Sequence, residues 1–227
     1  MNLSQQSEYL TIPAKSSSSV TVILIHGLGG NAKEMKLIAQ ELANDPALNH
    51  IKWLMPQVSL QPCTRLDGQV VPAWYDSRLG PDDEEGILHS VETLSYIVRQ
   101  EQEGGTKRVG ANMSLFVTVT RTDLKISGVV MRSGRMLLPE KLAESMRTSS
   151  AQDVPTFIGH GTDDEIITIQ MNGKCLDALK AAGFKVQENT NEVGGISYHV
   201  YEELGHSVKA QEMDDLKDWM KRNLPSD

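Results

Sequence analysis

The sequence predicts an α/β fold: a doubly wound, mainly parallel β-sheet with helices on both faces. Short, strongly apolar runs typical of buried strands alternate along the chain with longer stretches whose apolar residues recur at helical spacing. This alternation is typical of sheets built from strand–helix–strand units. The chain has 227 residues, 39% hydrophobic and 23% charged, which suits one sizeable core. We therefore predict a single domain over residues 1–227.

The first strand–helix–strand unit lies near the N-terminus. The apolar runs "VTVILI" at 20–25 and "IKWLMP" at 51–56 predict buried strands. Between them, Met35, Ile38 and Leu42 fall on one face of a predicted helix.

After a long loop, "DEEGILHSVETLSYIVRQEQEGG" carries apolar residues at helical spacing and predicts a helix that ends at Gly104 and Gly105.

Further strands and helices follow in the second half of the chain. Apolar runs predict strands at 126–134, 154–161 and 196–204, separated by helices around 176–182 and 213–223.

Composition excludes several classes of function. A formal net charge of -8 disfavours nucleic acid as a partner, because covering phosphates requires clustered Lys and Arg. Cys63 and Cys175 lie in unrelated segments without metal-ligand spacing, so we predict reduced thiols and no metal. The stretch GLGG is not the G-x-G-x-x-G dinucleotide fingerprint, and we expect no cofactor. The N-terminal stretch is polar, and no apolar run approaches the ~18 residues of a membrane span. We therefore expect a cytoplasmic protein without an integral membrane segment; the oligomeric state is left open.

Three loops that follow predicted strands carry groups suited to chemistry, and in such sheets function lies beyond the carboxyl ends of the strands. "ILIHGLGGN" has glycines that let main-chain N–H groups face a crevice. "FIGHGTDDEI" carries Asp163 and Asp164, and "YEELGHSV" carries His206. Each has a structural alternative: an aspartate in such a loop can cap a helix, and a loop histidine can simply be solvated.

Several segments together resemble one known family. "VTVILIHGLGGN" is similar to a strand followed by HGLGD, and "VVPAWYD" to MPSWFD. "VPTFIGHGTDDEI" resembles TPIFHGHGDxDPV, and "YEELGHS" resembles YxGMxHS. In order and content the chain resembles the acyl-protein thioesterase and small carboxylesterase branch of the α/β-hydrolases. The resemblance implies an α/β-hydrolase-like fold and hydrolysis of thioesters or esters, with S-acylated (palmitoylated) proteins or small acyl esters as partners.

The resemblance also assigns site residues. Asp164 matches the triad acid and His206 the triad base. Leu28 matches the position whose backbone N–H contributes to the oxyanion hole. Trp74 and Tyr75 are expected to line the substrate groove, although a tryptophan beside proline can equally be core packing.

Within the pattern H-G-x-x-D, His160 is the histidine and Asp163 falls on the variable position. Glu165 stands where the family has proline, which we expect to loosen the loop while leaving Asp164 in place.

The nucleophile segment departs from the family pattern. The family reads R-I-x-L-G-G-F-S-Q-G-G-A-x-x-S-L, whereas here "RV" at 108–109 runs directly into "GANMSL". About seven residues are absent, roughly one strand length, and the G-x-S-x-G motif occurs nowhere in the chain. Ser114 lies at nearly the right distance along the chain, but Asn112 and Phe116 occupy positions where the elbow needs minimal side chains. We therefore expect Ser114 not to act as a nucleophile, and Ser133 is less suited still.

The shortening leaves the central strand and elbow region, about 108–125, in question. "SLFVTVT" at 114–120 alternates and is rich in β-branched residues, so it can serve as a replacement strand, although the family uses this region as helix. Either choice predicts a distorted site. Two functions remain open: a thioesterase or carboxylesterase by descent, and a non-catalytic protein that binds acyl groups or lipidated partners. A further alternative is an incomplete gene model of an active enzyme.

Overall fold

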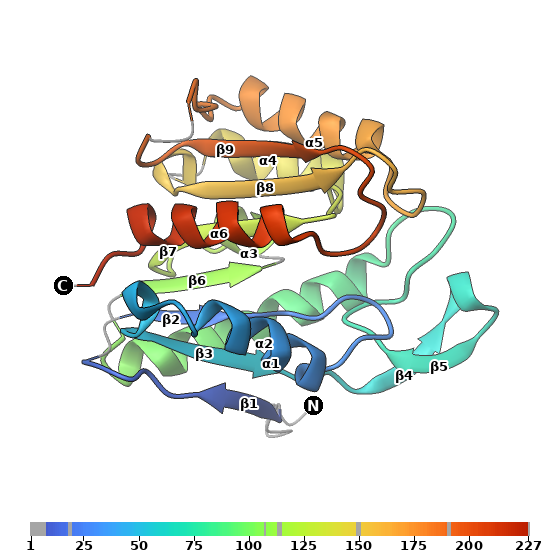
Figure 1. Cartoon of the computed structure of the whole chain (residues 1–227). Helices are drawn as coiled ribbons and strands as arrows, with labels where there is room; N and C mark the ends of the chain where they lie inside the picture. The colour runs from blue at the N-terminus through green and yellow to red at the C-terminus, as the bar shows by residue number, and fades with distance from the viewer. Residues whose placement is uncertain are drawn as a thin grey trace. The chain divides into compact units, whose positions relative to one another are not determined.

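The computed structural model of the chain divides into two compact units, Met1–Thr106 and Lys107–Asp227, and each is described by itself. The structure describes residues 8–17, 20–106, 108–112, 115–148, 151–189 and 192–226 (Figure 1).

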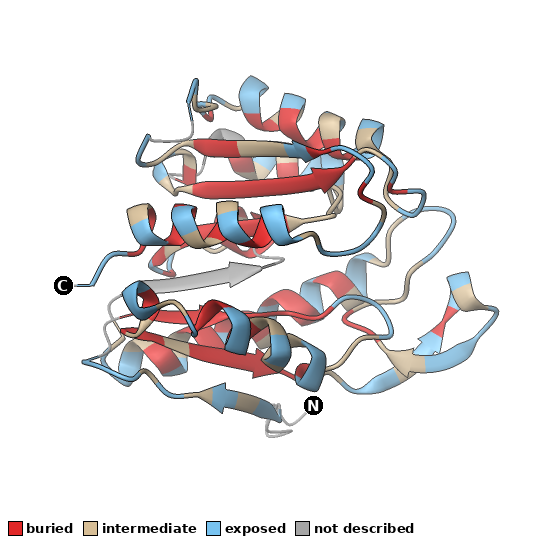
Figure 2. Cartoon of the chain, in the orientation of Figure 1, coloured by how far each residue is buried: buried red, intermediate tan, exposed pale blue. Residues whose placement is uncertain are grey.

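The first unit contains the predicted strand–helix–strand motif. Strand β3 (Ile51–Pro56) pairs in parallel with β2 (Val20–Ile23) and antiparallel with β1 (Tyr9–Ile12). Helix α1 (Ala32–Leu42) connects β2 to β3. Strand β2 is buried along its whole length, whereas β1 alternates between exposed and half-buried residues, as expected of a strand covered on one side only (Figure 2). The sequence predicted both buried strands, and β2 ends two residues earlier than expected.

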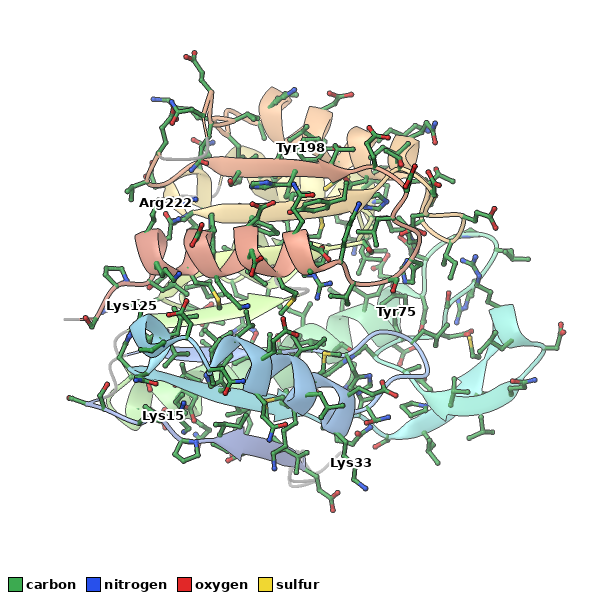
Figure 3. All side chains as sticks on the ribbon, viewed as in Figure 1. Lys15, Lys33, Tyr75, Lys125, Tyr198 and Arg222 are labelled. Carbon is green, nitrogen blue, oxygen red and sulfur yellow. The ribbon has the colours of Figure 1, made fainter. Side chains whose placement is uncertain are left out.

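Local hydrogen bonds define both ends of α1. The Asn31 side chain accepts from the Glu34 N–H, and the Glu34 carboxylate accepts from the Asn31 N–H, which forms a capping box. At the other end the ammonium group of Lys15, labelled in Figure 3, donates to the Ala43 carbonyl at 2.6 Å. A cation at a helix carboxyl end is favoured by the helix dipole.

Helix α2 (Glu84–Glu103) is held on the strands by a buried carboxylate. Glu101 accepts hydrogen bonds from the Thr21 hydroxyl at 2.7 Å and from the Lys52 ammonium at 2.7 and 2.9 Å. These bonds satisfy a group that would be costly to bury alone. The helix ends at Gly104, as the sequence predicts.

The rest of the first unit is an antiparallel hairpin of β4 (Leu60–Cys63) and β5 (Gln69–Pro72), with two short 3-10 helices at Pro46–Leu48 and Thr64–Leu66.

The second unit contains four parallel strands in the order β6-β7-β8-β9. Their bounds are β6 (Arg108–Asn112), β7 (Ile126–Arg132), β8 (Thr156–Gly161) and β9 (Ile196–Tyr201). The sequence predicted the last three of these strands. Because all four run the same way, their carboxyl ends lie along one edge.

Helices lie on both faces of these four strands. Their bounds are α3 (Leu115–Thr120), α4 (Pro139–Thr148), α5 (Ile169–Ala181) and α6 (Ala210–Asn223), with a 3-10 turn at Ala151–Asp153. In Figure 1, α6 lies in front of the strands, and α3 and α4 lie behind them. Among all described residues, no helix is both long and apolar enough to cross a bilayer.

For 114–120 the sequence left two structures open, a replacement strand and the helix of the family pattern, and the structure has the helix. Residues 115–120 form α3, and the strand comes instead from β6, which pairs with β7 with an irregular register between Val109 and Gly110. All residues from Leu115 to Val119 are buried, and α3 packs against β7 and α4. A helix buried all round needs no polar face, so tertiary packing overrides the strand propensity of these residues. Ser114 lies outside the described residues.

A buried ion pair fixes α6 to the end of β7. The Arg132 guanidinium donates from Nε and Nη2 to the two oxygens of Glu212, at 2.9 and 2.7 Å. The Glu212 side chain is only 1% exposed. A Cβ on Gly159 would lie 2.8 Å from Glu212 Oε1, so the glycine on β8 makes room for this pair. Such bidentate contacts fix the relative orientation of the two side chains as well as pairing their charges.

We predict that the amides of 108–125 exchange faster than those of β8. The reason is that a helix of only six residues and an irregular register between β6 and β7 are expected to lower the local stability of this segment. Hydrogen–deuterium exchange with mass spectrometry measures this, with the β8 peptide as the internal reference. Protection across 108–125 equal to that of β8 would show that the shortened chain packs well.

Candidate active site

The loop after β8 fixes the orientation of the Asp164 carboxylate. Its Oδ1 accepts the N–H groups of Ile166 and Ile167 at 3.0 and 2.9 Å, and the residue is only 3% exposed. The turn therefore leaves Oδ2 as the oxygen that faces another partner.

That partner is His206, which follows β9. The His206 Nδ1 lies 2.8 Å from Asp164 Oδ2, so the proximity predicted from the motif spacing is confirmed. Because a carboxylate only accepts, Nδ1 carries the proton and Nε2 is the nitrogen left to accept one. The His206 side chain is 40% exposed, so a molecule from solvent can reach it. The arrangement is that of an acid that orients a general base.

The surroundings keep Asp164 ionised. Burial, the largest influence, would raise the pKa of Asp164, but hydrogen bonds from the Ile167 N–H, from His206 and from the Ile166 N–H together hold the pKa below its ordinary value. An ionised acid is what stabilises a protonated His206 during proton transfer.

Main-chain contacts join the loops that carry the acid and the base. The N–H of Thr162 donates to the Tyr201 carbonyl and the N–H of Asp163 to the Leu204 carbonyl, both at 3.0 Å. A Cβ on Gly161 would lie 1.9 Å from the Leu204 oxygen. Only glycine therefore permits this approach.

Side chains reinforce the junction of the two loops. The Thr162 hydroxyl accepts the Glu203 N–H at 3.0 Å and donates to Asp163 Oδ1 at 2.8 Å. Asp163 thus helps to build the loop, as suits the variable position of the motif. Glu203 has φ of 57°, a left-handed conformation that favours glycine, and the resembled segment YxGMxHS has glycine at this position.

In the first unit the glycine-rich loop after β2 is held by main-chain hydrogen bonds. The N–H of Gly29 donates to the Pro72 carbonyl at 2.9 Å and that of Gly30 to Gly27 at 3.1 Å. Gly29 has φ of 75°, which glycine adopts without strain. Leu28 lies at the tip and is 44% exposed. The oxyanion-hole role of its N–H stays a prediction.

Trp74 packs beneath this loop. It is 8% exposed, and its indole N–H donates to the His26 carbonyl at 3.0 Å. The rings of Trp74 and His26 lie 5.8 Å apart. This geometry favours the core-packing alternative for Trp74, and its role in a substrate groove stays a prediction. Tyr75, labelled in Figure 3, is half-buried next to it.

Sequence reasoning did not assign structural roles to Gly161 or to the Trp74 indole. The H-G of the acid motif is the one available signal for Gly161, because a glycine directly after a strand indicates close backbone approach. In the described parts of the chain, no group of three or more His, Cys, Asp or Glu side chains is placed to hold a metal ion.

A strand-end acid hydrogen-bonded to a strand-end histidine, on parallel strands with helices on both faces, defines an α/β-hydrolase fold. Maize acyl-protein thioesterase 2 shares this fold with a TM-score of 0.82 at 24% identity, over 96% of this chain and 99% of that one. Arabidopsis SOBER1 has a TM-score of 0.75 at 24% identity, over 90% and 99%.

The sequence profile of the phospholipase/carboxylesterase family matches residues 8–224, and the chain belongs to this family. Acyl-protein thioesterase 1 of Yarrowia lipolytica is 30% identical to it, over 94% of this chain and 96% of the relative. Acyl-protein thioesterase 1 of Cryptococcus neoformans is 29% identical, over 96% and 98%.

We predict that Gly161→Ala lowers the free energy of unfolding by about 3 kcal/mol or more, because the new methyl group collides with main chain that cannot yield cheaply. Urea unfolding measures the change. Gly173→Ala is the matched control: this glycine lies inside α5 with open space around its Cβ position, so the same substitution should stabilise the protein by about 0.5–1 kcal/mol. Equal effects at the two positions would contradict the close-approach argument.

We also predict a pH dependence from Asp164. Its pKa is lowered in the folded chain from an ordinary value of 3.8, so the unfolded chain binds its proton more tightly. The resulting stability is fully present above the ordinary pKa and is lost as the pH falls through the lowered one. The free-energy difference between the native chain and Asp164→Asn should therefore shrink as the pH falls below 3.8 toward the lowered pKa of Asp164. Urea unfolding from pH 7 to pH 3 checks this, and a difference that stays constant throughout would refute it.

Proposed function

We propose that the chain recognises acyl esters or thioesters, with S-acylated proteins as the main substrate class, at a serine-hydrolase-type site. The observation that carries the proposal is the 2.8 Å contact between His206 Nδ1 and Asp164 Oδ2, which forms the acid–base half of such a site. The names of the relatives, acyl-protein thioesterases, supply the substrate class.

In this proposal His206 Nε2 takes the proton from the attacking oxygen and then delivers it to the leaving sulfur or oxygen. Asp164 holds the imidazole in the Nδ1–H tautomer and stabilises the imidazolium that forms. In the family pattern, Leu28 is the position whose N–H donates to the oxygen of the tetrahedral intermediate.

The nucleophile is the component that this chain lacks in recognisable form. G-x-S-x-G occurs nowhere in the sequence, and the second oxyanion donor of the family is the N–H directly after that serine. Loss of a triad serine reduces turnover by a factor on the order of 10⁶. The absent motif beside a retained acid–base pair favours a second candidate function, non-catalytic binding of acyl groups or lipidated proteins.

We predict hydrolysis of p-nitrophenyl butyrate and of palmitoyl thioesters hardly above background, because neither the carbonyl nor a water is held in line for attack. Insertion of V-L-G-G-F-S-Q after Val109 should produce activity, measured as steady-state kcat/KM, that is abolished by His206→Ala. Robust turnover by the unmodified chain that is lost on Ser114→Ala would overturn the proposal and make Ser114 the nucleophile.

Two further measurements separate the candidates. A fluorophosphonate probe should label the variant with the insertion and leave the unmodified chain unlabelled. Binding of an S-palmitoylated peptide by the unmodified chain, measured by calorimetry, supports the acyl-binding function, and absence of binding contradicts it. The transcript across codons 109 and 110 tests the alternative of an incomplete gene model.

A further inference from the structure

His160, near the end of β8 and directly before the acid loop, is fully buried beside Asp164. Its residue is 0% exposed and belongs to β8, a strand buried along its whole length. The imidazole Nε2 lies 2.7 Å from the Ile167 carbonyl oxygen. Because a carbonyl only accepts, Nε2 carries the proton and donates.

This hydrogen bond holds Ile167, one of the two residues whose N–H groups orient the acid. The carboxylate of Asp164 takes its orientation from the N–H groups of Ile166 and Ile167, and the Ile167 carbonyl is tied to His160. The His160 side chain, which belongs to β8, therefore fixes the end of the turn at Ile167. The near end is fixed by the strand itself.

The same imidazole also limits where the carboxylate can move. His160 Nε2 lies 3.7 Å from Asp164 Oδ2, the oxygen that binds His206. Its other nitrogen, Nδ1, is buried and has no hydrogen-bond partner among the described residues. Among the described residues, the imidazole therefore forms its hydrogen bond to this loop through Nε2 alone.

This anchor matters because residue 165 does not stiffen the loop backbone. Position 165 is Glu, which leaves φ free to vary where a proline would fix it. Glu165 is exposed, so packing does not restrain it either.

We propose that His160 is a positioning residue: through the Ile167 carbonyl it sets the Asp164 carboxylate so that His206 is held as the Nδ1–H tautomer. The inference deepens the proposed function, because it names what prepares the base of that site. It predicts a property of His206 that can be measured without substrate or turnover.

The experiment reads the His206 tautomer at a pH where the ring is neutral, by long-range ¹H–¹⁵N NMR of histidine-labelled protein. A neutral imidazole free of partners prefers the Nε2–H form, so the Nδ1–H form reports an engaged Asp164. Asp164→Asn gives the reference spectrum for the disengaged state. Melting temperature is measured for every variant.

Two substitutions separate the hydrogen bond from the volume of the ring. We expect His160→Leu to convert His206 to the Nε2–H form. His160→Gln places an amide N–H close to the position of Nε2, so it should retain the Nδ1–H form. The matched control is His199→Leu in β9, a mostly buried histidine whose partners are Ser197 and Asp215, which should retain it despite a similar loss of stability.

A folded His160→Leu variant that keeps the Nδ1–H form overturns the proposal, and so does conversion in His199→Leu, which would indicate general loosening. If His160→Leu does not fold, His160→Gln and His160→Asn decide. The shorter Asn does not reach the carbonyl and should convert His206, and identical behaviour of the two variants overturns the proposal. Failure to bind acyl peptides would refute the proposed function and leave this result untouched.

Discussion

The approach of the β8 backbone to the Leu204 carbonyl is the constraint on which the acid–base pair depends. Parallel strands bring their carboxyl ends to one edge, but that alone leaves loops free to diverge. Here Gly161 lets main chain touch main chain, and hydrogen bonds from Thr162 and Asp163 close the contact. Asp164 and His206 then follow within one and two residues of the junction, so backbone geometry determines their contact.

The predictable parts of the fold are those determined by the pattern of apolar residues within a short stretch of sequence. The short apolar run at 51–56 predicted a buried strand, and the structure has β3 there. In α2, apolar residues recur at helical spacing up to a pair of glycines, which predicted a helix that ends there. The Asp164–His206 contact was also predictable, because the family resemblance matches these residues, in loops after two strands, to the triad acid and base. When the strands are parallel, the loops that follow them lie at the same edge of the sheet, so residues in these loops can meet.

The parts that were not predictable depend on partners distant in sequence. The composition of 114–120 left both strand and helix open, and residues 115–120 form a helix that packs against β7 and α4. The sequence allowed Trp74 either to line a substrate groove or to pack in the core. The hydrogen bond from its indole N–H to the His26 carbonyl favours core packing. Glu203 adopts a left-handed conformation that no propensity scale assigns to glutamate, because the loop junction imposes it.

The ion pair beneath α6 has a consequence for how this chain can diverge. Glu212 Oε1 occupies the space that a side chain at Gly159 would need, and its charge is neutralised by Arg132. A larger residue at 159 requires the Glu212 carboxylate to shift or to be shortened, and loss of that carboxylate leaves Arg132 largely buried and unpaired. Positions 132, 159 and 212 should therefore covary among homologues, even where the surrounding surface residues vary.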